Sequence, residues 1–350
     1  MFKPCVILLL VNISMQCTLT SFKNNTIEIN GVNETISGCI SPDTIGFKGE
    51  ISRIYIKDQN IRDLNYGAVQ GISSKFAIDF FDAGIEIIRE GAFLHLPRLS
   101  WIFFWFNKIF WISENSFQDL PSLEGVHLVG NNFTDMSPRA FNNLPKLTTL
   151  YLVDNKLENF NSSWFYKTPA VHLIMLGQNR LRKIQRGAFI NLPAIEALDL
   201  NRNLIEFIHK DAFIGLRNLW HLNLAENKLK SFDCNFYAPT KLKEVDIRNN
   251  NITYISDEVL DVIRPQLSKL IVTDNPLQCA CLDKIVQWSD AFNISVPQKK
   301  ELQQSGAVCV FPKTKPSQCL ERGDDDFQEG FWVSFVRERA PVKPFEYNFE

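Results

Sequence analysis

The sequence is short of the residues and segments that several function classes need. Its 350 residues include only five His and four Met, and 37 Lys and Arg face 39 Asp and Glu. The resulting net charge of −2 offers no basic excess for nucleic-acid binding, so we expect no nucleic-acid partner. After the first residues, no apolar run approaches the ~20 residues of a membrane-spanning helix, so we expect no membrane span.

The first residues have the pattern of a secretory signal. Lys3 precedes the apolar run 5–11, which is too short to cross a membrane. The small residues that follow favour cleavage after Gln16, with cleavage after Cys17 as a close rival and a buried strand as the alternative. We expect residues 1–16 to be a signal peptide and the mature protein to be secreted and extracellular. Six Asn-x-Ser/Thr triplets fit that setting as glycosylation sites: Asn24, Asn33, Asn132, Asn161, Asn251 and Asn293.

What the sequence does contain is a repeat. The spacing of Leu123, Val126, Leu128, Asn131 and Phe133 returns along the chain in steps of about 24 residues. The Asn position falls at 59, 83, 107, 131, 155, 179, 203, 227, 250 and 275, which makes ten copies, with Gln and Ala in the first two. A second column keeps the same step with Phe93, Phe117, Phe141, Phe165, Phe189, Phe213 and Phe236.

This spacing predicts one short strand for each copy. The first, fourth and sixth positions of each strand point inward, and the Asn side chains can bond the turn backbone along the stack. No single unit could bury its apolar face alone, so stability is a sum over neighbours. We expect a right-handed solenoid with a concave parallel sheet and a convex side of loops, short helical turns and the Phe column.

The pattern resembles that of the leucine-rich repeat family at its 24-residue extracellular spacing. This resemblance implies an α/β solenoid, or horseshoe, of about ten repeats over residues 48–277 with disulfide-bonded caps. The segment that follows resembles the cysteine-rich C-terminal flank of extracellular members, such as animal innate-immune proteins and Toll-type receptor ectodomains. It implies a cap at 278–320 with Trp288 packed inside and the pairs Cys279–Cys309 and Cys281–Cys319. A metal site built on Cys-x-Cys is the alternative.

The remaining cysteines leave choices open. Cys39 precedes the first repeat, in an expected N-terminal cap at 17–47, and its natural partner is Cys17 if cleavage spares that residue. Cys234 lies in the eighth repeat, about 35 Å along the stack from Cys39 at ~4.8 Å per strand, too far for a disulfide. It is either a buried free thiol or the site of a disulfide-linked partner.

The concave face is where we expect binding. Its N-terminal half is apolar and aromatic and its C-terminal half is polar and charged, which marks an interaction surface. Small residues such as Gly125, Gly130 and Gly177 would let a partner approach closely. Burial of these aromatics by an irregular third repeat or by the tail is the alternative. The expected binding residues are Phe81, Trp101, Phe103, Trp105, Phe106, His127, Val129, Tyr151, Val153, Leu173 and Met175.

Chemistry is not expected. His127 and His221 lie four strands apart, or ~19 Å, and no glycine-rich phosphate loop or His-x-x-x-His pair occurs. We expect no enzyme activity, no cofactor and no metal. The tail 321–350 contains the tripeptide Arg322-Gly323-Asp324, which matches an integrin-binding motif.

These patterns favour a secreted, non-catalytic recognition protein. Its partner would be a protein, lipid-like or glycan ligand bound on the concave face, with innate immunity or signalling as the implied setting. Two alternatives remain. One is an extracellular matrix or cell-adhesion protein, and the other is a carrier subunit of a secreted enzyme. The repeat alone cannot separate these, because the fold sets a surface and not its ligand.

Overall fold

The computed structural model describes residues 17, 19–296, 309–312, 315, 317–322 and 332–333. The expected signal peptide, 1–16, and most of the tail 321–350 lie outside the described residues.

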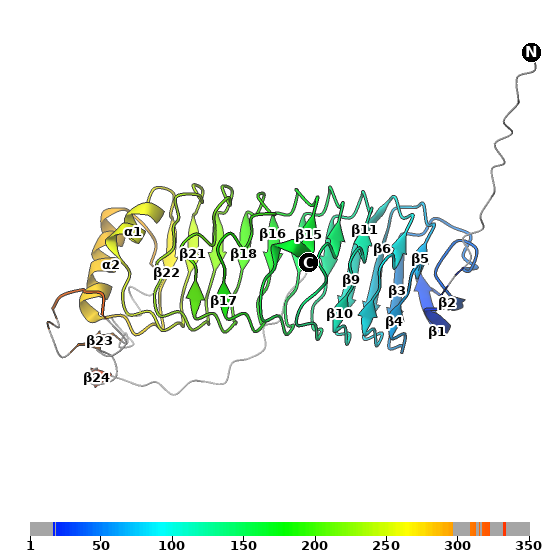
Figure 1. Ribbon diagram of the computed structural model, residues 1–350, viewed down its shortest axis with the longest axis horizontal. Coiled ribbons are helices and arrows are strands. Elements are labelled where there is room, and N and C mark those ends of the chain that lie inside the picture. The colour runs from blue at the N-terminus through cyan, green and yellow to red at the C-terminus, as the bar shows by residue number, and fades with distance from the viewer. Residues whose placement is uncertain are drawn as a thin grey trace, which may run out of the picture.

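The ten repeats form a solenoid around a long parallel sheet, so the predicted fold is confirmed (Figure 1). Each repeat pairs in parallel with the next, and an antiparallel hairpin extends the sheet at its N-terminal end. The twelve strands in sheet order are β2 (Val32–Gly38), β1 (Phe22–Ile29), β3 (Arg53–Lys57), β6 (Phe76–Phe81), β9 (Leu99–Trp105), β12 (Gly125–His127), β14 (Thr149–Tyr151), β16 (Leu173–Met175), β18 (Ala197–Asp199), β20 (His221–Asn223), β21 (Glu244–Asp246) and β22 (Lys269–Ile271).

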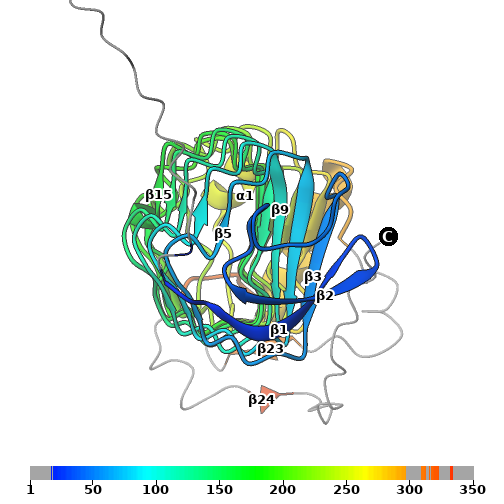
Figure 2. The same ribbon diagram turned by 90° about the vertical axis from the view of Figure 1, so that its right-hand side faces the viewer.

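The opposite side of the coil carries short parallel strands as well as the expected loops and turns. Figure 2 shows β15 across the coil from β3 and β9. One short helical turn of the expected kind lies on this side, the 3-10 helix η1 (Ser162–Trp164). The short strands are β4 (Asp63–Leu64), β5 (Val69–Gln70), β7 (Ile87–Ile88), β8 (Phe93–Leu94), β10 (Trp111–Ile112), β11 (Phe117–Gln118), β13 (Phe141–Asn142), β15 (Phe165–Tyr166), β17 (Lys183–Ile184) and β19 (Phe207–Ile208).

The asparagine column ties each turn to its neighbours, as the sequence predicted. Asn179 donates from Nδ2 to the carbonyl of Leu152 at 2.8 Å and accepts at Oδ1 from the N–H of Leu157 at 3.0 Å. Asn203 and Asn227 repeat both bonds one and two turns further on. These amides are buried, so each bond satisfies a backbone group that water cannot reach.

The Phe column is a buried stack with one insertion. Phe93, Phe117, Phe141 and Phe165 follow one another at centroid distances of 5.7, 5.1 and 5.4 Å, with nearly parallel rings. Phe160 then lies between two members of the column, 6.1 Å from Phe165 and 4.6 Å from Phe189. The repeated residue therefore fills the core from one copy to the next.

Both ends of the stack are covered by caps that contain disulfide bonds. The β1–β2 hairpin lies across the first repeat (Figure 2). Cys17 is bonded to Cys39. The other end carries α1 (Asp257–Ile263), α2 (Cys279–Ala291) and the pairing of β23 (Val310–Phe311) with β24 (Trp332–Val333). Cys279 is bonded to Cys309 and Cys281 to Cys319, the pairs that the resemblance implied, and Trp288 packs against the core.

Within the described residues, no helix is long and apolar enough to cross a membrane.

Candidate functional site

The outward side of the long parallel sheet, which we call the sheet face, carries a cluster of aromatic rings. On β9, Trp101, Phe103 and Trp105 alternate along one side of the strand, and their rings stack at 5.9 and 6.1 Å with interplanar angles of 13° and 9°. The next two strands add His127 and Tyr151 in the row of Phe103. We call these five residues the aromatic cluster.

His127 lies at the centre of the aromatic cluster. Its ring is 4.6 Å from Phe103 and 4.1 Å from Tyr151, and it also contacts both Trp rings. Only 5% of His127 is exposed, and this burial lowers its pKa to about 4. His127 is therefore neutral at physiological pH and supports the surrounding rings, which corrects the expectation that it faces a partner.

Two further expected contact residues are buried as well. Val129 and Val153 lie beneath the surface, whereas Phe81, Leu173 and Met175 remain partly exposed. Each Val lies two residues past the end of its strand, since β12 ends at His127 and β14 ends at Tyr151. The partly exposed surface of the cluster is made by Trp101, Phe103, Trp105 and Tyr151.

The three glycines of the sheet face accommodate side chains of this chain, which corrects the expectation that they leave room for a partner. A Cβ on Gly125 would lie 1.9 Å from Cζ3 of Trp101, so the indole rests on that glycine. A Cβ on Gly130 would lie 2.5 Å from Cδ1 of Phe106, and one on Gly177 would lie 2.2 Å from Oδ1 of Asn201. Side chains of neighbouring repeats thus occupy the space beside all three glycines.

Phe106 extends the apolar surface to the edge of the sheet. It is 52% exposed, and its ring packs edge-on against Phe81 with centroids 5.8 Å apart. Lys57 lies on the far side of Phe81, with Nζ 5.6 Å from the ring centroid. The partly exposed rings of Phe81 and Phe106 therefore continue the apolar surface beyond the aromatic cluster.

The C-terminal half of the sheet face is a network of charged groups. Glu244 accepts from Lys269 at 2.5 Å and lies 3.4 Å from Nδ1 of His221. Burial raises the pKa of Glu244, but the bonds from Lys269 and His221 outweigh it, so the pKa falls below its usual value. Burial raises the pKa of Asp199 and of Asp246 above the usual range, against the opposing N–H bonds that each accepts.

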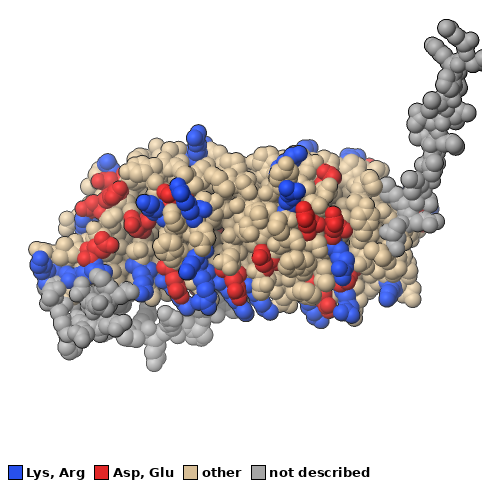
Figure 3. Space-filling model, viewed as in Figure 1, with Lys and Arg blue, Asp and Glu red and all other residues tan. Residues whose placement is uncertain are grey.

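Charge on the molecule is mixed in sign. Figure 3 shows Lys and Arg interspersed with Asp and Glu along the face in view. On the sheet face, Arg53 binds Asp79 at 2.8 Å, and Arg202 binds Glu226 at 3.0 Å. These pairs neutralise each other locally.

Cys234 is buried, with 6% of its surface exposed, and burial raises the pKa of its thiol far above the usual value. Of the two alternatives, the structure supports the buried free thiol. A disulfide to a partner needs an accessible thiolate, so the intermolecular alternative loses its basis.

The tripeptide motif begins on a residue that the C-terminal cap holds. Arg322 donates from Nε to Oε1 of Gln278 at 2.9 Å and from Nη2 to the carbonyl of Lys315 at 3.4 Å. Gly323 and Asp324 lie outside the described residues.

The sequon side chains lie on the surface. Asn24, Asn33, Asn161, Asn251 and Asn293 are exposed and Asn132 is half-buried. Glycosylation of these residues stays a prediction.

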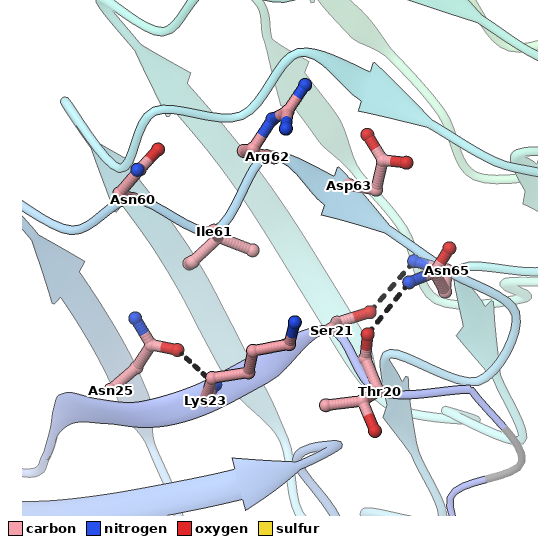
Figure 4. A pocket seen from close by; sticks show the side chains of 9 residues that line it. All are labelled: Thr20, Ser21, Lys23, Asn25, Asn60, Ile61, Arg62, Asp63 and Asn65. Atoms are coloured by element: carbon pink, nitrogen blue, oxygen red, sulfur yellow. Dashed lines mark hydrogen bonds between the residues drawn. The ribbon is translucent and has the colours of Figure 1, made fainter.

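A polar pocket of about 350 Å³ lies between β1 and the first repeat (Figure 4). Asn65 closes one side by donating to Oγ of Ser21 and to the carbonyl of Thr20, both at 2.9 Å. Lys23 and Ile61 point into the space, while Arg62 extends away toward Glu86 (Figure 4). The charged side chains that line this pocket therefore do not point toward one another. Across the described residues, no group of three His, Cys, Asp or Glu side chains could hold a metal ion.

Comparison with known proteins agrees with this geometry. The family model described as leucine rich repeat matches residues 105–157, 121–181 and 169–229. The chain therefore carries leucine-rich repeats over the matched residues and folds as a leucine-rich repeat solenoid. No curated protein shows significant sequence similarity to this leucine-rich repeat protein.

The RP105 structure shares the fold of this chain. The mouse RP105/MD-1 complex matches with a TM-score of 0.57 and 19% identity, over 77% of this chain and 46% of that one. The TLR13–ssRNA13 complex matches with a TM-score of 0.46 and 20% identity, over 57% of this chain and 33% of that one. This leucine-rich repeat protein thus spans less than half the length of either structure, and at these identities the likeness concerns the fold alone.

Proposed function

We propose that this leucine-rich repeat protein is a secreted, non-catalytic recognition protein that binds a macromolecular partner through the sheet face. The observation that carries the proposal is the aromatic cluster, in which three adjacent strands hold five rings in contact. Trp and Tyr are enriched among the side chains that dominate binding energy. The cluster would serve as the anchor of the interface.

The rings of the cluster are packed against one another before any partner arrives. Trp101 rests on Gly125, and Phe103 is held between the two Trp rings and His127. Immobilising a free side chain on binding costs about 0.5–1.5 kcal/mol. Rings that are already packed avoid much of this cost, so the cluster suits a binding role better than scattered surface aromatics would.

The composition of the sheet face favours a protein partner. An apolar anchor beside a charged network matches the mixed apolar and polar character of protein interfaces. The paired charges of Arg53 with Asp79 and Arg202 with Glu226 give little attraction for a polyanion. The matching RP105 structure contains the protein MD-1, which makes a protein the first class to test.

The alternative functions differ from this proposal in the partner or in the surface that binds it. A carrier subunit would use the same face, so its partner would be an enzyme. Adhesion through the tripeptide would need a free Arg322, whose guanidinium is bonded to the C-terminal cap. A role in innate immunity rests on the resemblance and follows only from the partner's identity.

The test is capture of secreted proteins on immobilised protein, with the double variant Trp101→Ser, Trp105→Ser beside wild type. Trp220→Ser is the matched control, because Trp220 is 41% exposed at the edge of the charged half. Thermal unfolding checks that all three proteins are folded. We expect the double variant alone to lose a partner that wild type and control retain. Equal capture by all three would show that the cluster is not the binding site.

A further inference from the structure

Phe106 occupies a backbone position that suits it poorly. The residue before each asparagine-column position has a positive φ in every repeat, and Phe106 has φ +53°. The left-handed region is rare for bulky residues and favoured by Gly, Asn and Asp. The other nine copies have Asp58, Asp82, Gly130, Asp154, Gln178, Arg202, Glu226, Asn249 and Asp274. The only aromatic residue in this column is therefore both strained and half exposed, which points to a function.

The ring of Phe106 is directed over the next turn. Its Cδ1 and Cε1 would lie 2.5 and 3.0 Å from a Cβ on Gly130, so only glycine lets the ring lie there. Two residues after Gly130 comes Asn132, the first residue of an Asn-x-Thr triplet. Two residues of chain span at most about 7 Å. The half-buried Asn132 and the exposed Phe106 ring are therefore near neighbours.

We infer that Asn132 carries an N-linked glycan whose first sugar packs against the exposed face of Phe106. This inference rests on the secretion that is part of the proposed function. The Nδ2 of Asn132 would displace the diphosphate of a lipid-linked oligosaccharide at C1 of the sugar. A C–N bond forms, the sugar–phosphate C–O bond breaks, and Nδ2 loses one proton.

The contact gives the exposed ring a permanent cover. Burying apolar surface is favourable by roughly 25 cal/mol per Å², so a sugar face on the ring offsets part of the backbone strain. The sugar would sit at the carboxyl end of β9 and leave Trp101 and Phe103, further along the strand, open to a partner. The glycan thereby limits the apolar surface to the aromatic cluster.

The chain supplies a matched control in its ninth repeat. Asn251 follows the asparagine column as Asn132 does, also starts an Asn-x-Thr triplet, and makes the equivalent backbone bond. The N–H of Asn132 binds the carbonyl of Ile109 and that of Asn251 binds the carbonyl of Leu229, both at 2.8 Å. The residue of the preceding turn that corresponds to Phe106 is Glu226, which is paired with Arg202. A glycan on Asn251 has no aromatic ring there.

The experiment expresses the full chain in secretory cells and reads glycan occupancy by glycopeptide mass spectrometry. Thermal unfolding is then compared for wild type, Asn132→Gln, Phe106→Asp and the double variant, with Asn251→Gln as control. We expect occupancy at Asn132 and a melting temperature about 2 °C lower in Asn132→Gln than in wild type. The loss should vanish when Phe106 is already Asp, and Asn251→Gln should show no such coupling. Trimming the glycans to their first sugar should preserve the effect.

The outcomes separate the two proposals. Failure of secretion would overturn the secretion on which both rest, whereas a secreted protein without a glycan at any sequon would overturn this inference alone. Glycans at other sequons with Asn132 empty would overturn this inference alone. Occupancy of Asn132 with equal effects of Asn132→Gln in both Phe106 backgrounds would likewise refute the contact with the ring and leave the proposed function standing.

Discussion

Replacing Gly125 by Ala tests whether the aromatic cluster is built as described. The backbone of Gly125 does not require glycine, because its φ is not in the left-handed region. The added Cβ would lie 1.9, 2.3 and 2.6 Å from three atoms of the Trp101 ring. Carbon atoms in contact lie about 3.5–4.0 Å apart, so the indole would have to withdraw by roughly 1.6 Å.

The expected cost follows from what that movement breaks. Overpacking of this kind costs about 1–3 kcal/mol, and loss of the stacked Phe103 contact about 0.5–1.5 kcal/mol. A Gly-to-Ala change gains about 0.4–1 kcal/mol through the unfolded chain. We expect Gly125→Ala to lower the free energy of unfolding by about 1–3 kcal/mol and to change the Trp emission and the affinity for a captured partner.

Urea unfolding followed by fluorescence measures this effect. Gly46→Ala is the control, since its Cβ would meet Oε1 of Glu34 at an ordinary 3.6 Å, so its free energy of unfolding should rise only by the unfolded-chain gain of about 0.4–1 kcal/mol. A Gly125→Ala protein as stable as wild type, with unchanged emission, would refute the packing of Trp101 on Gly125.

Four further predictions follow from buried polar groups. Because burial lowers the pKa of His127 to about 4, below the ~6.5 of an unfolded His, stability should fall as pH drops from about 6.5 to 4. His127→Phe should flatten that part of a urea-derived stability profile. Asn179→Ala leaves the N–H of Leu157 without its bond and the carbonyl of Leu152 with only the bond from Asn155, and should cost about 1–3 kcal/mol in urea unfolding. Cys234, whose pKa burial raises, should resist thiol reagents until the protein unfolds, and non-reducing gels should show no dimer through it. Burial also raises the pKa of Asp199 in the folded state, so its ionisation with rising pH opposes folding. Asp199→Asn should be more stable than wild type at pH 7, with the gain shrinking toward pH 3.

Much of the fold could be predicted because each repeat restates the same constraint. The spacing of apolar residues fixed which side chains point inward, and the structure buries Val126, Leu150 and Ile174 in one row. The Asn and Phe columns follow from the same period. The insertion of Phe160 between Phe165 and Phe189 could not be read, because Phe160 stands outside the repeating column.

The placement of the aromatic residues on the sheet face could be predicted, but their exposure only in part. The column positions located Trp101, Phe103 and Trp105 on the sheet face. They could not show that His127 would be enclosed by its neighbours, since enclosure depends on ring sizes in three adjacent strands. The prediction that Gly125, Gly130 and Gly177 leave room for a partner was wrong for the same reason. A missing side chain looks like free space until the neighbouring indole is seen to fill it.

The sequence by itself determined that the chain forms a solenoid, that each copy stacks on the next, and which residues share a column. A 24-residue period leaves each copy only its neighbours to pack against. Only the tertiary structure decided which of those side chains remain exposed. Exposure of Trp101 or burial of Val153 depends on contacts between copies, where residues 24 positions apart lie side by side. Those contacts pack the rings on the sheet face into the aromatic cluster and place it beside a network of charged groups.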